Sequence, residues 1–305
     1  MKNQQVAIQY LILLPGFYSN IVYLPYIVDF VKIRKLISAY KTKLLGQKNA
    51  TERVMLGEVA VTVTEGAINK KADKDDAWWY AMAQRYGKIY DVGANVGYST
   101  MLACLNDMDK TVLLADPNPM ALEVARQNLE RNGMGNCKSY VNAFVGEQRG
   151  NQVKFYTLGT GSAGSMFGSH ADSAKAVNAW YMVDTTTLDD IVAETGIVPQ
   201  LVKIDVEAAE SHVLNGAQAL ARQQTAIFLV EMHAPPEMPM LKNAGLVLDW
   251  CTANSYQAYY MKEHTLLTSP EQIAHRGRCH LLLLPSRMPY PEYLEAIGEG
   301  DEIRW

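Results

Sequence analysis

Two acidic residues follow short apolar segments at a spacing that suits a nucleotide cofactor. Residues 88–91 end in Asp91, and a turn that contains Gly93, Asn95 and Gly97 follows at once. A strand, a tight turn and a helix start of this kind place a ligand at the carboxyl end of the strand. We expect the turn to contact the cofactor: Gly93 permits the tight bend, and Gly97 lets helix and ligand approach without an intervening Cβ. We expect Asp91 to accept hydrogen bonds from the ligand.

A second apolar segment, residues 111–115, ends in Asp116 about one β-α-β repeat later. An acid at the end of the second strand can hold a ribose diol through two hydrogen bonds. The alternative is that Asp116 is an exposed residue that caps the helix beginning near Pro119. Together the two acids and the glycine turn indicate a cofactor with an adenosine group, either a dinucleotide or S-adenosylmethionine.

The turn favours S-adenosylmethionine over a dinucleotide. Dinucleotide sites usually contain Gly-x-Gly-x-x-Gly, because the pyrophosphate lies flat on the helix N-terminus. Here three residues separate Gly93 from Gly97, Tyr98 follows, and there is no third glycine. The negative charge of Asp91 would also repel a pyrophosphate, whereas it suits a cationic amino-acid group.

Two later strands carry residues that could activate a methyl acceptor. In residues 201–205, Lys203 and Asp205 share a face by strand alternation, and Asp205 falls at the carboxyl end. Asp205 could accept a hydroxyl proton, orient the acceptor or bind a divalent metal ion. Glu207 and Glu210 either join this site or complement the dipole of the next helix.

The next strand, residues 226–232, delivers Glu231 and His233 to the same edge of the sheet. Histidine is the usual general base for a hydroxyl. The alternative is that His233 packs or caps before Pro235. The predicted catalytic residues are therefore Asp205, His233 and Lys203, and no separate set of metal ligands is predicted.

The chain resembles the FkbM-type S-adenosylmethionine-dependent methyltransferases from about residue 75 to residue 285. Five motifs in the family's order carry the resemblance: residues 91–97, 115–119, 141–146, 201–210 and 229–233. The chain departs from the family at Ala208, where Gly is usual, and at Asp116, where Glu is more frequent.

The resemblance implies a Rossmann-like class I methyltransferase of the α/β class, with a mostly parallel seven-stranded sheet and helices on both faces. It implies that Asn142 and Ala143, near the end of a third strand over 139–145, contact the adenine, although Asn142 could equally form a turn. It also implies O-methylation of a hydroxyl, in a sugar of a glycan or in a secondary metabolite.

The remaining segments supply the elements that position these residues. We expect a strand pair over 53–67, helices over 76–86, 119–132 and 187–196, an added strand over 152–157, and an antiparallel closing strand over 280–284. The Gly- and Ser-rich loop 159–170 could cover the substrate, with His170 as a proton acceptor or simply a solvated residue.

The chain divides into an apolar and basic extension over 1–50, the methyltransferase domain over 51–290 and an acidic tail over 291–305. The first part has no charge from Asn3 to Val28, but Pro15 and Pro25 interrupt the ~20 apolar residues that a membrane span requires. No signal cleavage site is evident. We expect an arm that packs on the domain or on a second subunit, or a peripheral membrane contact.

Composition excludes some partners. The net charge of −4 gives no basic footprint for nucleic acid, and four scattered cysteines without metal spacing suit a reducing cytoplasm. No Asp-Pro-Pro-Tyr motif follows residues 201–205, so an amino-group methyltransferase of nucleic acids is disfavoured; Asp116-Pro117-Asn118-Pro119 lies after the second strand instead. Two alternatives remain, an NAD-dependent oxidoreductase and a non-catalytic scaffold.

Overall fold

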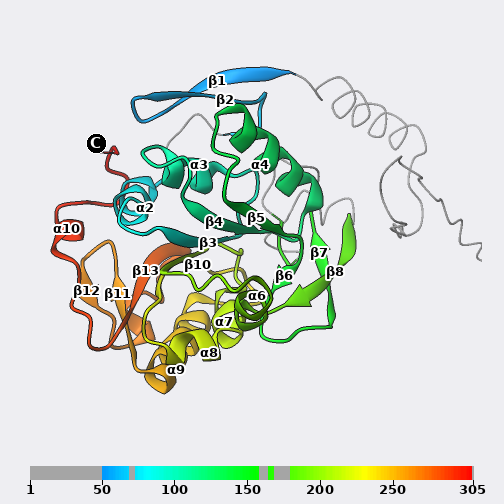
Figure 1. Cartoon of the computed structure of the whole chain (residues 1–305). Coiled ribbons are helices and arrows are strands. Elements are labelled where there is room, and N and C mark those ends of the chain that lie inside the picture. The colour runs from blue at the N-terminus through cyan, green and yellow to red at the C-terminus, as the bar shows by residue number, and fades with distance from the viewer. Residues whose placement is uncertain (1–49, 69–72, 158–163, 168–178, 304–305) are drawn as a thin grey trace, which may run out of the picture.

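A central sheet of eight strands organises the residues that the computed structural model describes, which are 50–68, 73–157, 164–167 and 179–303 (Figure 1). The strand order is β12-β11-β13-β10-β9-β3-β4-β5. The strands are β3 (Lys88–Val92), β4 (Thr111–Ala115), β5 (Lys138–Val141), β9 (Leu201–Ile204), β10 (Ile227–His233), β11 (Tyr256–Tyr260), β12 (Thr265–Leu266) and β13 (Arg278–Pro285).

The five strands from β10 to β5 run parallel, and β13 is antiparallel to both β10 and β11. The expected fold class, with a mostly parallel sheet and an antiparallel closing strand, is confirmed. The short edge strand β12 is an eighth strand beyond the seven that were expected. Strand β10 is buried along its whole length, as parallel strands between two helical layers are.

Helices cover both faces of this sheet (Figure 1). One face carries α2 (Asp76–Ala83), α3 (Tyr98–Cys104) and α4 (Pro119–Arg131), and the other carries α6 (Leu188–Thr195), α7 (Glu210–Asn215), α8 (Gln218–Arg222) and α9 (Met240–Asn254). Each layer has its own apolar core. As expected, Thr187 is the N-cap of α6 and accepts a hydrogen bond from the Asp190 N–H, and the helix ends at Gly196.

The third expected strand is interrupted, so the prediction of one strand over 139–145 is wrong. Strand β5 ends at Val141, and β6 (Phe144–Val145) joins a separate sheet with β7 (Gln152–Tyr156) and β8 (Trp180–Thr186). The side chain of Asn142 donates to the carbonyls of Asp116 and Pro117, both at 3.0 Å, and thereby fixes the turn between the two sheets.

The hairpin of β1 (Thr51–Leu56) and β2 (Val59–Thr64) confirms the expected strand pair but does not join the central sheet. Two asparagine side chains, one in α4 and one directly after its end, cover its edge instead. The Oδ1 atoms of Asn128 and Asn132 accept hydrogen bonds from backbone N–H groups of β2, both at 2.8 Å. Such pairing protects an exposed strand edge.

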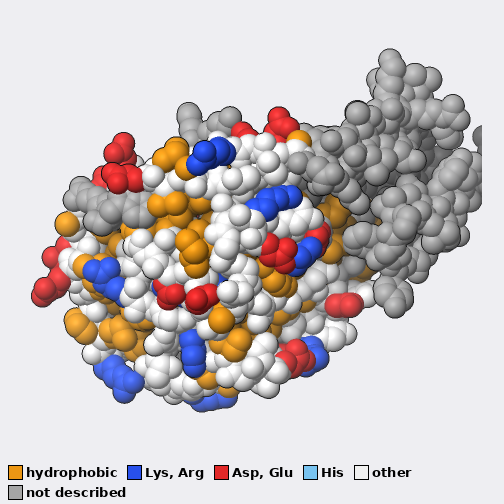
Figure 2. All heavy atoms as spheres, turned by 45° about the horizontal axis from the view of Figure 1, so that its top comes forward, with side chains coloured by type: hydrophobic (Ala, Val, Ile, Leu, Met, Phe, Trp, Pro, Cys, Tyr) orange, Lys and Arg blue, Asp and Glu red, His pale blue; other side chains and the backbone are white. Residues whose placement is uncertain are grey.

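The short 3-10 helix η2 (Pro270–Gln272) precedes β13, and the C-terminal segment after β13 packs on the domain through α10 (Glu292–Glu295). Leu294 is fully buried, and the Trp78 indole donates to the carbonyl of Ile297 at 2.6 Å. The extension over 1–49, His170 and most of its loop lie outside the described residues. Within the described ranges, no helix is both long and apolar enough to cross a membrane. On the face in Figure 2, acidic and basic side chains of described residues are interspersed.

Candidate active site

A cavity of about 630 Å³ lies at the carboxyl ends of β3, β4 and β9. One end is lined by the β3–α3 turn, Asp116 and Ala143, and the other end by Asp75, Lys203 and Asp205. Ligands of open α/β sheets bind at this edge. We call these the turn end and the ionic end of the cavity.

Gly93 brings the turn against the end of β9. Its φ is +89°, and a Cβ there would lie 1.8 Å from the backbone oxygen of Asp205. No side chain fits in that space, so glycine is required both by the backbone conformation and by the close approach. Gly93 therefore joins the two halves of the site.

Gly97 has a packing role that the sequence did not indicate. A Cβ on Gly97 would lie 3.0 Å from the Cβ of Ala125, so this glycine lets α3 contact α4. Gly97 is not among the described residues that line the cavity, although its neighbours Val96 and Tyr98 are. Contact of Gly97 with a cofactor stays a prediction.

Asp116 lies in the cavity wall with both carboxylate oxygens engaged by the backbone. Oδ2 accepts from the Asn95 N–H at 2.9 Å, and Oδ1 accepts from the Asn118 N–H at 2.7 Å. Burial raises the pKa of Asp116 to about 6, although these two N–H groups favour the charged form. Asn118, not Asp116, caps α4, so the alternative of an exposed cap is wrong. Each oxygen retains a lone pair for a ribose hydroxyl.

Asp91 lies behind the cavity wall. It is buried, and its Oδ2 accepts hydrogen bonds from the hydroxyls of Ser99 and Thr100, both at 2.6 Å. Burial raises the pKa of Asp91, while the charge of Lys203 opposes that rise. The carboxylate thus positions the first turn of α3, and direct contact with a ligand stays a prediction.

The wall at the turn end is apolar beside Ala143. Phe144 and Phe155, which sequence reasoning missed, also line the cavity. Asn142 is exposed and holds the turn described above, which supports the turn-forming alternative for this residue. This apolar wall suits a flat base that has polar groups only at its edge.

The ionic end consists of ten side chains joined by ion pairs of 4.0 Å or less, which we call the ionic cluster. Its members are Asp73, Asp75, Lys203, Asp205, Glu207, Glu210, Glu231, His233, Arg278 and His280. Glu231 is the hub, since it contacts Lys203, His233, Arg278 and His280. These contacts with His233, His280 and Lys203 lower the pKa of Glu231 even though burial opposes the charge.

Lys203 and Asp205 lie together on one face, as strand alternation predicts. The Lys203 Nζ is 3.1 Å from Asp205 Oδ2 and 3.3 Å from Asp75 Oδ2. Burial disfavours the ammonium, but these carboxylates and Glu231 outweigh it and raise the pKa of Lys203. Burial and the charge of Glu231 raise the pKa of Asp205 to about 8, while the charges of Lys203 and His233 oppose the rise.

His233 is placed to hold charge rather than to remove a proton. Its Nδ1 is 3.1 Å from Glu210, and its Nε2 is 3.5 Å from both Glu207 and Glu231. Burial alone would lower its pKa, but these carboxylates raise the pKa of His233 to about 11. His233 is not among the described residues that line the cavity. At neutral pH it is an imidazolium, which has no free lone pair with which to accept a proton.

Glu210 is a buried partner of His233, not only a complement to the dipole of α7. Its Oε2 accepts from Asn243 Nδ2 at 2.8 Å, and its Oε1 accepts from the Ala208 N–H at 2.9 Å. Ala208 has a φ of +81°, a conformation that favours glycine. This chain adopts that conformation with alanine, at the position where the sequence comparison expects glycine.

Four members of the ionic cluster were missed by sequence reasoning: Asp73, Asp75, Arg278 and His280. The three acids among residues 73–76 gave a usable signal, because so many carboxylates before a buried helix need partners. Arg278 and His280 gave none, since their pairing depends on the antiparallel register of β13 with β10.

The chain matches the family model described as "Methyltransferase FkbM domain" over residues 91–257. No curated protein matches the chain.

Several solved structures are similar to it. Methyltransferase FkbM from Methylobacillus flagellatus is 17% identical with a TM-score of 0.39, over 65% of this chain and 43% of that one, so the chain spans less than half of that protein's length. An O-methyltransferase from Bacillus cereus in complex with SAH is 11% identical, with a TM-score of 0.39, over 84% of this chain and 91% of that one. Precorrin-6y C5,15-methyltransferase from Geobacter metallireducens is 9% identical, with a TM-score of 0.39, over 72% of this chain and 91% of that one.

Proposed function

The chain belongs to the FkbM methyltransferase family, and from this premise we propose that it transfers a methyl group from S-adenosylmethionine to a hydroxyl group. The observation that carries the proposal is that one cavity joins the turn at Gly93 to the ion pair of Lys203 and Asp205. A donor held at the turn end would direct its methyl group toward an acceptor held at the ionic end.

The residues at the turn end fit the donor. Asp116 offers two carboxylate oxygens for the ribose diol, and the wall at Ala143 and Phe144 suits an adenine. Bound S-adenosylmethionine supplies an activated methyl group on a sulfonium that is already a good leaving group. The surplus of carboxylates around the cavity favours a ligand with positive charge.

The residues at the ionic end fit an acceptor hydroxyl. Asp205 is the member of the cluster that combines exposure to the cavity with a raised pKa, which is what a carboxylate base requires. We assign to Asp205 the removal of the hydroxyl proton as the new carbon–oxygen bond forms. Lys203, 3.1 Å away, fixes the direction of that carboxylate, and the alignment of donor and acceptor supplies most of the rate enhancement.

The acceptor class follows from the lining of the ionic end. Asp73, Asp75 and Glu207 also line the cavity and can accept hydrogen bonds from several hydroxyls at once. This lining supports a polyhydroxylated acceptor, such as a sugar of a glycan or of a secondary metabolite.

An NAD-dependent oxidoreductase is the weaker alternative, because the pyrophosphate of a dinucleotide would lie among carboxylates. Six carboxylate residues line the cavity, against three basic ones. Repulsion of that kind disfavours a doubly charged anion.

Calorimetric titration of the full chain with S-adenosylhomocysteine, and with NADH in parallel, tests the donor. We expect binding of S-adenosylhomocysteine alone, with Asp116→Ala weakening it. Binding of NADH alone, or of neither ligand, would contradict the proposal. A second comparison isolates catalysis: Asp205→Asn should keep the affinity for S-adenosylhomocysteine and lose methyl transfer to a panel of sugar acceptors, whereas exposed Asp184→Asn should keep both. If Asp205→Asn keeps full turnover, the assigned base is wrong.

A further inference from the structure

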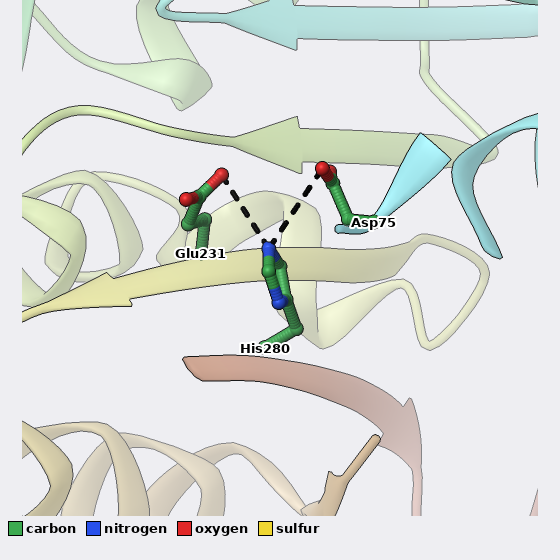
Figure 3. A group of neighbouring side chains, drawn as sticks. All are labelled: Asp75, Glu231 and His280. Atoms are coloured by element: carbon green, nitrogen blue, oxygen red, sulfur yellow. Dashed lines mark ion pairs between the residues drawn. The ribbon is translucent and has the colours of Figure 1, made fainter. Parts of the chain in front are cut away.

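Three side chains from distant segments meet just beneath the ionic end of the cavity: Asp75, Glu231 and His280 (Figure 3). Asp75 precedes α2, Glu231 lies on β10, and His280 lies directly opposite Glu231 on the antiparallel β13. Their relative exposures are 3%, 2% and 2%. Their nearest donor atoms all lie within 4.8 Å of one another.

His280 is the member that points to a ligand. Neither of its ring nitrogens has a hydrogen-bond partner among the described residues. Its Nε2 is aimed between the two carboxylates, 3.4 Å from Glu231 Oε2 and 3.9 Å from Asp75 Oδ1 (Figure 3). Both distances exceed those of a good hydrogen bond, so the two carboxylates attract the ring but leave its buried nitrogens without hydrogen bonds, which is unfavourable.

We propose that Asp75, Glu231 and His280 bind a divalent transition-metal ion through one nitrogen and two carboxylate oxygens. Metal–ligand bonds of about 2.0–2.2 Å place neighbouring donor atoms about 3.3 Å apart in a tetrahedral site. The observed separation of 3.4 Å between His280 Nε2 and Glu231 Oε2 matches that value, and Asp75 has to approach slightly. Mixed imidazole and carboxylate donors suit zinc and its neighbours in the first transition row.

The charge of the ionic cluster supports a bound cation. Six carboxylates face two permanent cations, Lys203 and Arg278, and two imidazoles. A His280 ring that binds a metal ion is neutral, so with His233 protonated the carboxylates of this cluster exceed its positive charges by three. One divalent ion offsets most of that excess in a buried place where unbalanced charge is costly.

Lys203 lies beside the proposed site and contacts both of its carboxylates. Its Nζ is 3.3 Å from Oδ2 of Asp75, whereas the Asp75 oxygen that faces His280 is Oδ1. The same Nζ is 3.8 Å from Glu231 Oε2, which faces His280 as well, so Glu231 would share this oxygen between the ion and the ammonium. The Asp75 carboxylate can therefore bridge the metal ion and the ammonium. An ion in this place would fix Asp75 and, through it, Lys203 beside Asp205.

Metal binding by the full-length protein tests the site without requiring methyl transfer, so its outcome is separate from that of the proposed function. Protein stripped with a chelator is dialysed against Zn²⁺, and bound metal is measured by mass spectrometry. We expect one ion per chain, with affinity reduced more than about tenfold in both His280→Gln and Asp75→Asn. Mn²⁺ is the second probe, and Mg²⁺, which prefers oxygen ligands, should bind more weakly.

His264→Gln is the matched control, because His264 and His280 both pack edge-on against Trp78 and differ in their polar partners. This control should retain the ion. Zn²⁺ should raise the melting temperature of the parent and of His264→Gln but not of the two site variants, and circular dichroism shows that those variants are folded. Absence of binding for both Zn²⁺ and Mn²⁺, retention of the ion in His280→Gln, or equal affinity for Mg²⁺ would overturn the proposal.

Discussion

The two ends of the cavity are built in opposite ways. The turn end is made of backbone and small residues that are close in sequence: Gly93, Asn95 and Asp116 interact through N–H groups and a tight bend. The ionic end is made of long charged side chains from segments as far apart as Asp75 and His280. The first end is fixed by local geometry, and the second by pairing of buried charges.

This difference determines how each end responds to mutation. A turn with no space tolerates no added atom, so one methyl group should be enough to destroy it. A network of charges tolerates shape changes better, but removal of one charge leaves its partners buried and unpaired. The following predictions measure the two kinds of sensitivity, from the largest effect to the smallest.

Gly93→Ala should have the largest effect on the turn end. The new methyl group would overlap the backbone of Asp205, and alanine at a φ of +89° is strained. We expect a loss of about 4 kcal/mol in the free energy of unfolding, from both causes together, and no binding of S-adenosylhomocysteine. Chemical denaturation and calorimetry measure the two quantities.

Gly150→Ala is the matched control for that strain. Gly150 has a φ of +80°, but nothing lies within 4 Å of the position of a Cβ. We expect a loss of only about 1 kcal/mol from the backbone conformation. Equal losses at the two glycines would show that close contact with β9 is not what requires Gly93.

Glu231→Gln should have the largest effect on the ionic end. This change keeps the shape of the side chain but removes the charge that four basic side chains share. We expect a loss of about 3 kcal/mol in the free energy of unfolding. Glu123→Gln, in an exposed pair with Arg126, should change it by less than about 0.5 kcal/mol. Similar values for both variants would mean that the cluster is no more than a solvated set of charges.

The same contrast explains how far the sequence could predict the site. Asp91, Gly93 and Asp116 sit at strand ends that are close in sequence, so their neighbourhood follows from one β-α-β unit. The Lys203–Asp205 contact follows from alternation within a single strand. The pairing of Glu231 with His280 depends on the register between two strands in residues that are 49 positions apart in the sequence, which no local pattern encodes.

The sequence analysis did not predict helix α9 or strands β8 and β11. For α9 the reason is that no distinctive cap marks its start: its N-cap, Pro239, makes no side-chain cap hydrogen bond. In contrast, α4 and α6 begin at Asn118 and Thr187, whose side chains cap them, and both were predicted near their true bounds.

Lowering the pH should weaken cofactor binding at the turn end by a moderate amount. Asp116, with a pKa of about 6, accepts a proton as pH falls through that value and then loses acceptor capacity for the ribose hydroxyls. We expect affinity for adenosine to fall about fivefold to tenfold between pH 7 and pH 5. Adenosine is chosen because it lacks the amino-acid group of the cofactor, and calorimetry at each pH gives the affinity.

Asp116→Asn should bind adenosine weakly at every pH in that range. Its affinity should no longer depend on pH if the Asp116 carboxylate is the group that titrates. A wild-type profile that is flat from pH 5 to pH 7 would remove Asp116 from the ribose site.

The smallest effect is expected where the two ends meet, at Asp76. This carboxylate accepts hydrogen bonds from the Tyr98 hydroxyl and the Asp73 N–H, and burial raises its pKa from 3.8 to about 7. The folded protein therefore retains a proton that the unfolded chain has already lost, and stability from this group falls as pH rises from about 4 to about 7.

Asp76→Asn removes that loss and keeps an oxygen acceptor for Tyr98. We expect it to stabilise the protein by about 1 kcal/mol more at pH 8 than at pH 5, since relaxation and water reduce the full value of the pKa shift. Thermal or denaturant unfolding at the two pH values measures this difference, with exposed Asp184→Asn as the control for loss of a charge. If Asp76→Asn destabilises the protein more at pH 8 than at pH 5, the Asp76 carboxylate is stabilised by its partners as a charge, and this junction belongs with the ionic cluster rather than between the two ends.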